Sequence, residues 1–303
     1  MSSSASLHHR SVIITGAGKG LGRAFAHDLA QRGCRVVVNN RAHEGVPSAA
    51  ESVASEIHSA GGDAVADHSD MQDAGVGEAL VNTALAHYGA IDGLILNAGI
   101  TGPAAKVADS SFVDLRSVFE TNFFSAVSIV MAALPSLRKS TDARVVFVAS
   151  TAGLYGVRGR APYAASKAAM VAYALTLAAE LKREGVGVNI LVPYAETQMT
   201  AGLGDSGLDL SPALVAPVTS WLMSPECHAS GEIWVSGGGY VRRARMEEGL
   251  GAALPTDGCD PVAWLAANAH QAGDMQAGRG FPGAEAAFTD LMTRLQAARG
   301  GAA

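Results

Sequence analysis

The chain has 303 residues, of which 49% are hydrophobic and 17% charged, and its formal net charge is −6. A chain of this length can bury a large core without disulfides or a structural metal, and its apolar content excludes disorder over the whole length. The acidic balance argues against a protein whose main partner is nucleic acid.

Short runs rich in β-branched residues recur along the chain, each followed by a segment of helical length. Several runs are continuous rather than alternating, which is typical of strands buried on both faces. The seven runs are Ser11–Thr15, Arg35–Asn39, Asp63–Ala66, Gly93–Leu96, Arg144–Ala149, Val186–Val192 and Glu232–Ser236. This alternation predicts right-handed βαβ units and an α/β fold: a Rossmann-type, doubly wound, seven-stranded parallel sheet flanked by helices.

The first predicted strand leads into a glycine-rich turn with the spacing TGxxxGxG. Glycines between a strand and a helix N-terminus let backbone amides approach a phosphate group. The spacing is not that of a P-loop, which needs Ser or Thr after GK, nor that of GxGxxG. We predict a dinucleotide-binding turn, the alternative being a glycine-rich turn without a ligand. Its contact residues are Gly16, Gly18, Lys19, Gly20, Leu21 and Gly22.

The second predicted strand ends in Asn39, Asn40 and Arg41. In dinucleotide-binding folds an acidic side chain at this place binds the ribose hydroxyls of NAD, whereas an arginine accommodates the 2′-phosphate of NADP. Asn40 stands where the acid is expected, and Lys19 adds a second cation. The sequence therefore favours NADP(H) over NAD(H), unless Arg41 is simply a solvated surface residue.

Chemically useful side chains follow the later strands. Asn97–Ala98–Gly99 ends the fourth strand and Ser150 ends the fifth, while Tyr163 and Lys167 are spaced to share one helix face. A free tyrosine has a pKa of about 10, so proton exchange near neutral pH needs a stabilised phenolate, and a lysine cation can supply that. Two hydroxyls can then donate to a developing oxyanion. The alternative is an ordinary helical Tyr–Lys pair.

These motifs, in this order over roughly residues 10 to 240, resemble the short-chain dehydrogenase/reductase family. The resemblance implies an NAD(P)(H)-dependent oxidoreductase that interconverts a secondary alcohol and a ketone. It makes Tyr163 the general acid/base, Lys167 its electrostatic partner and ribose ligand, and Ser150 the holder of the carbonyl oxygen. It also places Asn122 in a proton relay.

The same resemblance implies further contacts. Asp67 matches the position that contacts adenine. Other cofactor contacts are implied for Asn97, Ala98, Gly99, Tyr163, Lys167 and Pro193. Family members associate through the helices around 111–139 and 162–183, so a homodimer or homotetramer is expected.

Within the family, the sequence is most similar to the hydroxyacyl-CoA dehydrogenase domain of peroxisomal multifunctional β-oxidation enzymes and bacterial relatives. TGAGKGLGRAFA, RVVVNN, VPYAETQMT and the segment from VAPVTSWLM to EEGLGA carry this similarity, and the chain continues far beyond Gly239 as in that branch. Those relatives usually carry Asp at the place of Asn40 and a neutral residue at that of Lys19, and family members generally have Gly at the place of Tyr194. The substrate is therefore left open between a 3-hydroxyacyl-CoA, a steroid and another cyclic or natural-product ketone.

Three loops leave the strand ends that carry the chemistry and are expected to form the substrate pocket: Thr101–Asp109, Gly153–Arg160 and Tyr194–Leu210. Its apolar lining is predicted from Leu154, Tyr155, Met199 and Leu203. Candidates to meet a CoA phosphate are Arg158, Arg160, Arg242, Arg243 and Arg245. Two other function classes stay open: a catalytically silent nucleotide-sensing or scaffold protein, and a non-redox enzyme on the same fold.

The strand–helix pattern ends near residue 240. Residues 249–260 and 272–283 are rich in Gly, Pro and Ala, and apolar residues with helical spacing follow over 288–295. We predict a dinucleotide-binding catalytic domain over residues 1–240 and a C-terminal extension over 241–303, packed on the same domain.

Cysteine and histidine usage bounds the cellular setting. The three cysteines form no CxxC pair and the nine histidines show no metal-ligand spacing, so free thiols in a reducing compartment and no metal are predicted. No uninterrupted apolar run approaches the roughly 18 to 20 residues that span a bilayer. We expect a cytoplasmic protein that acts on a small molecule and binds neither nucleic acid nor membrane.

Overall fold

The computed structural model describes residues 7–196, 208–255 and 258–300. The chain divides into two compact units, Met1–Arg243 and Ala244–Ala303. The predicted boundary at residue 240 and the predicted packing of the C-terminal extension on the catalytic domain stay predictions.

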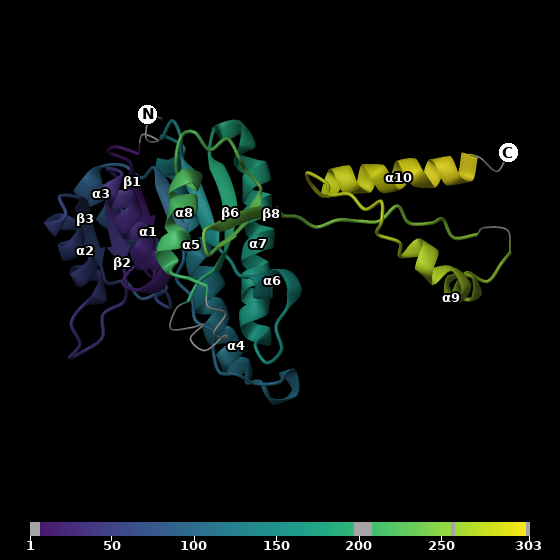
Figure 1. Cartoon of the computed structure of the whole chain (residues 1–303), viewed down its shortest axis with the longest axis horizontal. Coiled ribbons are helices and arrows are strands. Elements are labelled where there is room, and N and C mark those ends of the chain that lie inside the picture. The colour runs from purple at the N-terminus through teal and green to yellow at the C-terminus, as the bar shows by residue number, and fades with distance from the viewer. Residues whose placement is uncertain (1–6, 197–207, 256–257, 301–303) are drawn as a thin grey trace. The chain divides into compact units, whose positions relative to one another are not determined.

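The larger unit is built on one sheet, which in the described residues has eight strands in the order β3-β2-β1-β4-β5-β6-β7-β8 (Figure 1). The strands are β1 Ser11–Ile14, β2 Arg35–Asn39, β3 Asp63–Asp67, β4 Gly93–Leu96, β5 Arg144–Val148, β6 Gly187–Tyr194, β7 Ile233–Gly237 and β8 Tyr240–Ala244. The pairs from β1 to β7 are all parallel. The predicted doubly wound α/β fold is confirmed. Because the strand order reverses at β1 and β4, a crevice for a ligand is expected at the ends of these two strands.

The predicted strand number of seven is wrong by one, since β8 follows β7. Gly238 and Gly239 join the two strands with φ of +56° and +78°, and a two-residue link with both φ positive is the turn of a β-hairpin. The last strand therefore runs back along β7, unlike its parallel neighbours. Its sequence, YVRRA, is mostly exposed and partly charged. Edge strands commonly have such a composition, and it conceals them from hydrophobic periodicity.

Helices cover both faces of the sheet. Helix α1 contacts α2 and α8, whereas α3 contacts α5 and α4 contacts α7. A five-residue π-helical turn, Glu120–Phe124, joins α4 to α5. The helices are α1 Gly20–Gln31, α2 Ala49–Ser59, α3 Val76–Tyr88, α4 Phe112–Phe119, α5 Ser125–Leu137, α6 Thr151–Tyr155, α7 Ala161–Leu181, α8 Ala216–Leu222, α9 Pro261–Ala272 and α10 Ala284–Gly300.

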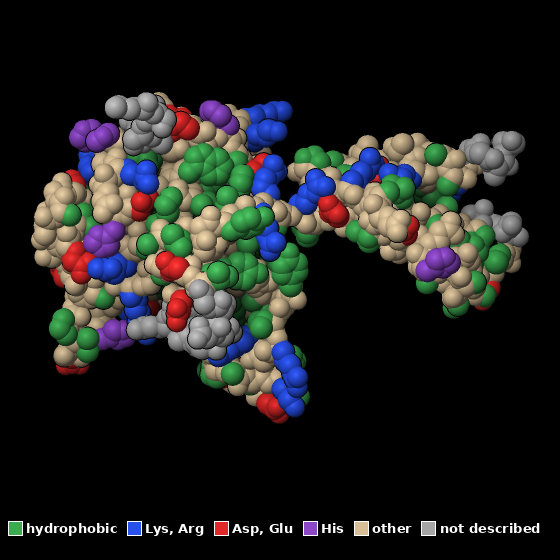
Figure 2. All heavy atoms as spheres, viewed as in Figure 1, with side chains coloured by type: hydrophobic (Ala, Val, Ile, Leu, Met, Phe, Trp, Pro, Cys, Tyr) green, Lys and Arg blue, Asp and Glu red, His purple; other side chains and the backbone are tan. Residues whose placement is uncertain are grey.

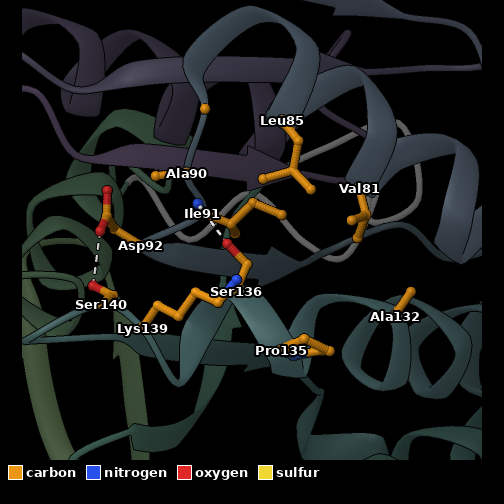
Figure 3. Close-up of a pocket in the computed structure, with 11 residues that line it drawn as sticks. Val81, Leu85, Ala90, Ile91, Asp92, Ala132, Pro135, Ser136, Lys139 and Ser140 are labelled. Atoms are coloured by element: carbon orange, nitrogen blue, oxygen red, sulfur yellow. Dashed lines mark hydrogen bonds between the residues drawn. The ribbon is translucent and has the colours of Figure 1, made fainter.

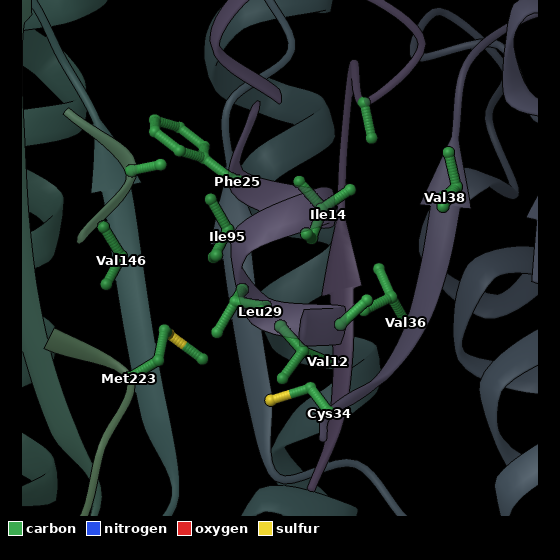
Figure 4. Packing of buried hydrophobic residues seen from close by; sticks show 14 of the residues in the cluster. Val12, Ile14, Phe25, Leu29, Cys34, Val36, Val38, Ile95, Val146 and Met223 are labelled. Atoms are coloured by element: carbon green, nitrogen blue, oxygen red, sulfur yellow. The ribbon is translucent and has the colours of Figure 1, made fainter. Parts of the chain in front are cut away.

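Burial of both sheet faces explains the continuous apolar runs. Val12 and Ile14 of β1 belong to a cluster with Phe25 and Leu29 of α1 (Figure 4). Ile13, between them, is equally buried on the opposite side of the pleat. Burying one such side chain stabilises the fold by roughly 1.5–3 kcal/mol. The central strands are thereby held firmly, and the polar loops at their ends are carried on a rigid base.

Two helical stretches, Phe112–Leu137 and Ala161–Glu184, are long and apolar enough to cross a membrane by length and composition alone. Neither stretch is an uninterrupted apolar run in the sequence. Helix α5 packs on α3 and β4, and α7 packs on β5 and β6. Their hydropathy is therefore accounted for by burial within an α/β layer.

The smaller unit contains α9 and α10. The Asp260 carboxylate caps α9 by accepting from the Val262 amide at 3.0 Å. Glu248 and Arg279 exchange backbone hydrogen bonds, both of 3.0 Å, and Asp290 pairs with Arg279 and Arg294. Local caps and ion pairs thus stabilise this unit.

Candidate active site

The predicted glycine turn lies between β1 and α1 and is folded tightly on itself. Gly16 and Gly20 have φ of +63° and +56°, a region that favours glycine. A Cβ on Gly22 would lie 2.3 Å from the Gly16 carbonyl oxygen, and one on Gly18 would lie 2.7 Å from Asn40 Cγ. A side chain at either position would collide with the turn itself or with Asn40. The glycines therefore allow the turn to close tightly, and a tight glycine turn before a helix can bind a dinucleotide phosphate through its backbone amides.

The helix that follows the turn begins without an acidic first turn. Lys19 is its N-cap residue, and among the described residues no side chain caps the first amides of α1. Leu21 packs against the hydrophobic core cluster. The free amides and the helix dipole favour an anion at this point.

A polar clamp joins the glycine turn to the end of β4. The buried Thr15 hydroxyl accepts from the amides of Asn97 at 3.0 Å and Ala98 at 2.9 Å. In return, Asn97 Nδ2 donates to the carbonyls of Thr15 at 2.9 Å and Gly16 at 3.2 Å. The Asn97 side chain, predicted to contact the cofactor, thus holds the turn that would bind it.

The ends of β2 and β3 are linked by a second buried set. The Asp67 carboxylate accepts from Asn39 Nδ2, the Ser69 amide and the Thr83 hydroxyl, each at 2.9 Å. Asp67 is only 7% exposed. The side chain for which an adenine contact was predicted is thus already engaged inside the protein by three donors.

The cations predicted at this end lie at the surface. Lys19 is exposed. Arg41 is half-exposed and pairs with Asp70 at 3.4 Å. Asn40 lies against Gly18, and its amide donates to the Arg41 carbonyl at 3.1 Å. No acidic side chain stands at the end of β2 itself, as the sequence shows.

Tyr163, Lys167 and Ser150 come together at the ends of the central strands. Tyr163 and Lys167 lie one turn apart at the start of α7, with Lys167 Nζ 6.0 Å from the centroid of the phenol ring. Ser150 follows β5 and caps α6, where its hydroxyl accepts from the Ala152 amide at 3.2 Å. Its hydroxyl is also hydrogen-bonded to Tyr163.

Burial changes the acidity of both groups on α7. It raises the pKa of Tyr163, and the hydrogen bond from Ser150 acts in the opposite direction. Burial lowers the pKa of Lys167 to about 8, because a cation is poorly solvated there. The Lys167 ammonium donates to the Val148 carbonyl at 2.8 Å. A lysine tuned in this way still carries its charge mostly at neutral pH.

Asn122 is hydrogen-bonded both to the loop after β4 and to α7. It lies in the π-helical turn and is 1% exposed. Its Oδ1 accepts from the Ile100 amide at 2.7 Å, and its Nδ2 donates to the Ile100 carbonyl and to the Ser166 hydroxyl, both at 2.9 Å. Single π-helical turns of this kind are frequent at functional sites.

Comparison with known proteins shows the family of this chain. The family model described as short chain dehydrogenase matches residues 10–206, more than half of the chain. The chain belongs to the short-chain dehydrogenase family. A short-chain type dehydrogenase/reductase of Mycobacterium tuberculosis is 36% identical over 246 residues, covering 78% of this chain and 85% of that protein. This short-chain dehydrogenase is therefore an oxidoreductase of that family.

A longer relative is similar to the same region. The peroxisomal multifunctional enzyme type 2 of Drosophila melanogaster is 35% identical over 260 residues, covering 84% of this chain and 43% of that enzyme. Its full-length structure matches with a TM-score of 0.80 at 28% identity, covering 95% of this chain and 50% of that chain. A short chain dehydrogenase from Mycobacterium avium matches with a TM-score of 0.78 at 33% identity, covering 88% and 95% of the two chains. This short-chain dehydrogenase thus spans about half the length of the Drosophila enzyme or less.

The structure places most of the predicted site residues of this short-chain dehydrogenase at one sheet edge. Pro193 is near the end of β6, opposite Ser236 of β7. Met199 and Leu203, predicted for the substrate pocket, lie outside the described residues. The prediction missed Thr15, Asn39 and Ser166, whose hydrogen-bond partners lie on other segments of the chain. Of the three, only Thr15 offers a sequence signal, because it directly precedes the glycine motif.

Two cavities lie where the strands begin, at the sheet edge opposite the predicted site. One, of about 250 Å³, lies between α3 and α5 (Figure 3). There the Ser140 hydroxyl donates to Asp92 at 2.7 Å, and the Ile91 amide donates to the Ser136 hydroxyl at 3.1 Å. The other, of about 380 Å³, is lined by residues before β2 and β3. Neither cavity contains the predicted catalytic side chains of this short-chain dehydrogenase.

Proposed function

We propose that this protein is an NADP(H)-dependent oxidoreductase that interconverts a secondary alcohol and a ketone, with Tyr163 as general acid/base. The observation that carries the proposal is the meeting of Tyr163, Lys167 and Ser150 at the ends of the central strands. Tyr163 and Lys167 lie one turn apart on α7, and Ser150, which follows β5, is hydrogen-bonded to the phenol.

Different residues of the chain would bind the cofactor and transfer the proton. The glycine turn and the α1 N-terminus would hold the phosphates, and Lys167 a ribose. When bound, the nicotinamide supplies or accepts the hydride. For ketone reduction, Tyr163 gives its proton to the substrate oxygen while Ser150 donates a hydrogen bond to it. The Lys167 cation stabilises the resulting phenolate. Alcohol oxidation reverses the proton transfer.

The preference for NADP(H) rests on charge. Lys19 and Arg41 are accessible, and Asn40 replaces the carboxylate that would repel a 2′-phosphate. The Arg41–Asp70 pair is exposed, and such pairs are worth only about 0.2–1 kcal/mol. A phosphate can therefore displace Asp70 from Arg41 at small cost.

Cofactor titration tests this preference. Arg41→Ala is expected to weaken NADPH binding about tenfold and leave NADH binding nearly unchanged. A charge-assisted hydrogen bond contributes about 1.5–3 kcal/mol, and the loss of the Arg41–Asp70 pair on NADPH binding offsets part of that gain. Arg138→Ala is a matched control, since Arg138 is as exposed as Arg41 and also pairs with a carboxylate, that of Glu184. Tighter binding of NADH than of NADPH by the unmodified protein contradicts the preference.

One observation favours a CoA ester among the substrates considered. The loops 101–109 and 153–160 are joined by a bridge between Ala105 and Arg160, and the exposed cations Lys106 and Arg158 flank this bridge. Arg243 and Arg245 are already paired, with Glu232 and Glu247 respectively. We propose a 3-hydroxyacyl-CoA or its ketone as substrate, with a steroid or another cyclic or natural-product ketone as the alternative.

Turnover of a substrate panel by Tyr163→Phe tests the function itself. The variant should bind NADPH normally and lose turnover by about 10²- to 10⁴-fold, since it lacks only the exchangeable proton. Equal inertness of both proteins with cofactor bound would support a sensor or scaffold. Product formation without a change in reduced-nicotinamide absorbance would indicate a non-redox enzyme.

A further inference from the structure

Ser166 is a buried polar side chain that the proposed reaction does not use. It is 0% exposed and lies on α7 between Tyr163 and Lys167. Its hydroxyl donates to the Tyr163 carbonyl at 2.9 Å. Serines on helices often bond back to the preceding turn, so this contact alone indicates nothing special.

A second contact distinguishes Ser166 from an ordinary helical serine. Its oxygen accepts from Asn122 Nδ2 at 2.9 Å, and Asn122 belongs to the π-helical turn rather than to α7. The hydroxyl therefore passes a hydrogen bond from the Asn122 amide to the backbone of Tyr163. Such chains polarise their members and fix the direction of each group.

The other end of the chain reaches the β4 loop. Asn122 binds both backbone groups of Ile100, the residue after the Asn97–Gly99 segment. Gly99 is so close that a Cβ there would lie 3.2 Å from Asn122 Oδ1 and 3.4 Å from Lys167 Nζ. One buried line of hydrogen bonds thus runs from the β4 loop through Asn122 and Ser166 to Tyr163.

We propose that Ser166 is a positioning residue that fixes the first turn of α7, with its phenol and ammonium groups, against the β4 loop. This inference rests on the proposed function. Ser166 acts through Asn122 and the backbone of Tyr163 and does not touch the substrate. Each hydrogen bond in this line is short, 2.7–2.9 Å, so the line holds the first turn of α7 in a fixed position relative to the β4 loop.

Removal of the hydroxyl should loosen α7 without removing a reacting group. Ser166→Ala is expected to lower kcat about tenfold, because small misplacements of catalytic groups are costly. KM for the cofactor should change less than about twofold, since the Thr15–Asn97 clamp is intact. The Ser150–Tyr163 hydrogen bond should weaken as well. The rising limb of the pH profile for alcohol oxidation should then move to higher pH, because that bond lowers the pKa of Tyr163.

Matched variants separate positioning from stability. Thr176→Ala removes a similar back-bond, from Thr176 to the Ala172 carbonyl at 3.1 Å, on the exposed side of the same helix; it should leave kcat and the pH profile unchanged. Ser166→Thr keeps the hydroxyl and should restore kcat to within about threefold, even if its extra methyl lowers Tm. Ser166→Cys, a weaker donor of similar size, should fall between Ser and Ala and replaces Ser166→Ala if the latter does not fold.

A double-mutant cycle gives the decisive result. If Asn122 and Ser166 act through the same line of hydrogen bonds, Ser166→Ala should lower kcat only slightly further in a protein that already carries Asn122→Ala. The proposal is overturned if the two losses multiply, or if Ser166→Ala lowers Tm while kcat and the pH limb stay unchanged. These outcomes differ from failure of the proposed function, in which the unmodified protein turns over no alcohol or ketone at all.

Discussion

At the scale of single residues, Lys167 combines a stability cost with its proposed role beside Tyr163. Its ammonium group is buried, 3% exposed, and donates to the Val148 carbonyl. Burial of a cation is unfavourable, and we propose that the protein tolerates it here because the charge stabilises the phenolate of Tyr163. The lowered pKa of Lys167, about 8, is the sign of this cost.

The cost predicts a pH-dependent stability. Between pH 8 and about 10.5, the ordinary lysine pKa, the unfolded chain keeps a proton that folded Lys167 has lost. The free energy of unfolding should therefore rise with pH through this window, by up to about 1.4 kcal/mol per pH unit. Lys167→Met should lack this rise and be more stable than the unmodified protein at pH 7, as urea unfolding at pH 7, 8 and 9 would measure.

The buried thiol of Cys34 acts in the opposite direction and at higher pH. Burial raises the pKa of this thiol from its ordinary value of 9.0 to about 12. The free energy of unfolding should therefore fall with pH only above pH 9, where the thiol of the unfolded chain ionises first. This effect is present in both proteins and cancels in their difference. Equal pH slopes for the unmodified protein and Lys167→Met between pH 7 and 9 would show that Lys167 is not buried as a cation.

At the scale of elements, the site depends on clamps between strand ends. The glycine turn after β1 has no helical or strand ladder of its own, and the Asn97 amide supplies hydrogen bonds to its carbonyls. Asn97→Ala should therefore lower the free energy of unfolding by about 1–3 kcal/mol, because buried carbonyls lose partners. It should also weaken NADPH binding about tenfold, since the turn is no longer fixed. Calorimetry and cofactor titration would measure the two effects.

Asn189→Ala is the control for that prediction. Asn189 is also buried, and its Nδ2 donates to the Ala229 carbonyl at 2.8 Å, between β6 and the segment before β7. A similar loss of stability with unchanged NADPH binding is expected. If both variants weaken NADPH binding equally, Asn97 acts only through general stability.

These clamps also show where sequence reasoning ends. The strands and the glycine turn were predictable because their signals, apolar runs and glycine spacing, are local. Asn97 meets Thr15 across 82 positions, and no local pattern announces that contact. The π-helical turn around Asn122 has no sequence signature, so its place in the site followed only from family resemblance. The edge strand β8 was missed because its charged, exposed sequence resembles a loop.

At the scale of the whole molecule, the charged side chains are dispersed over the surface, whereas large exposed apolar side chains lie together on one set of helices. Acidic and basic side chains are scattered among apolar ones on the face shown in Figure 2, as expected for a chain with a net charge of −6. In contrast, large apolar side chains are exposed along α4, the π-helical turn and α5: Phe112, Val113, Phe124 and Met131 are 50–75% exposed. Such patches mark surfaces that are covered in an assembly.

We propose that a second copy of the chain covers this helical face, as a homodimer or within a homotetramer. Phe124 and Met131 are seven residues apart, two helical turns, so a partner helix would contact both. The double variant Phe124→Asp, Met131→Asp should therefore shift the mass in solution, measured by light scattering, to the 30.9 kDa of one chain. Val46→Asp, which alters an equally exposed apolar residue on a loop, should leave the assembly intact. A single-chain mass for the unmodified protein would contradict the proposal.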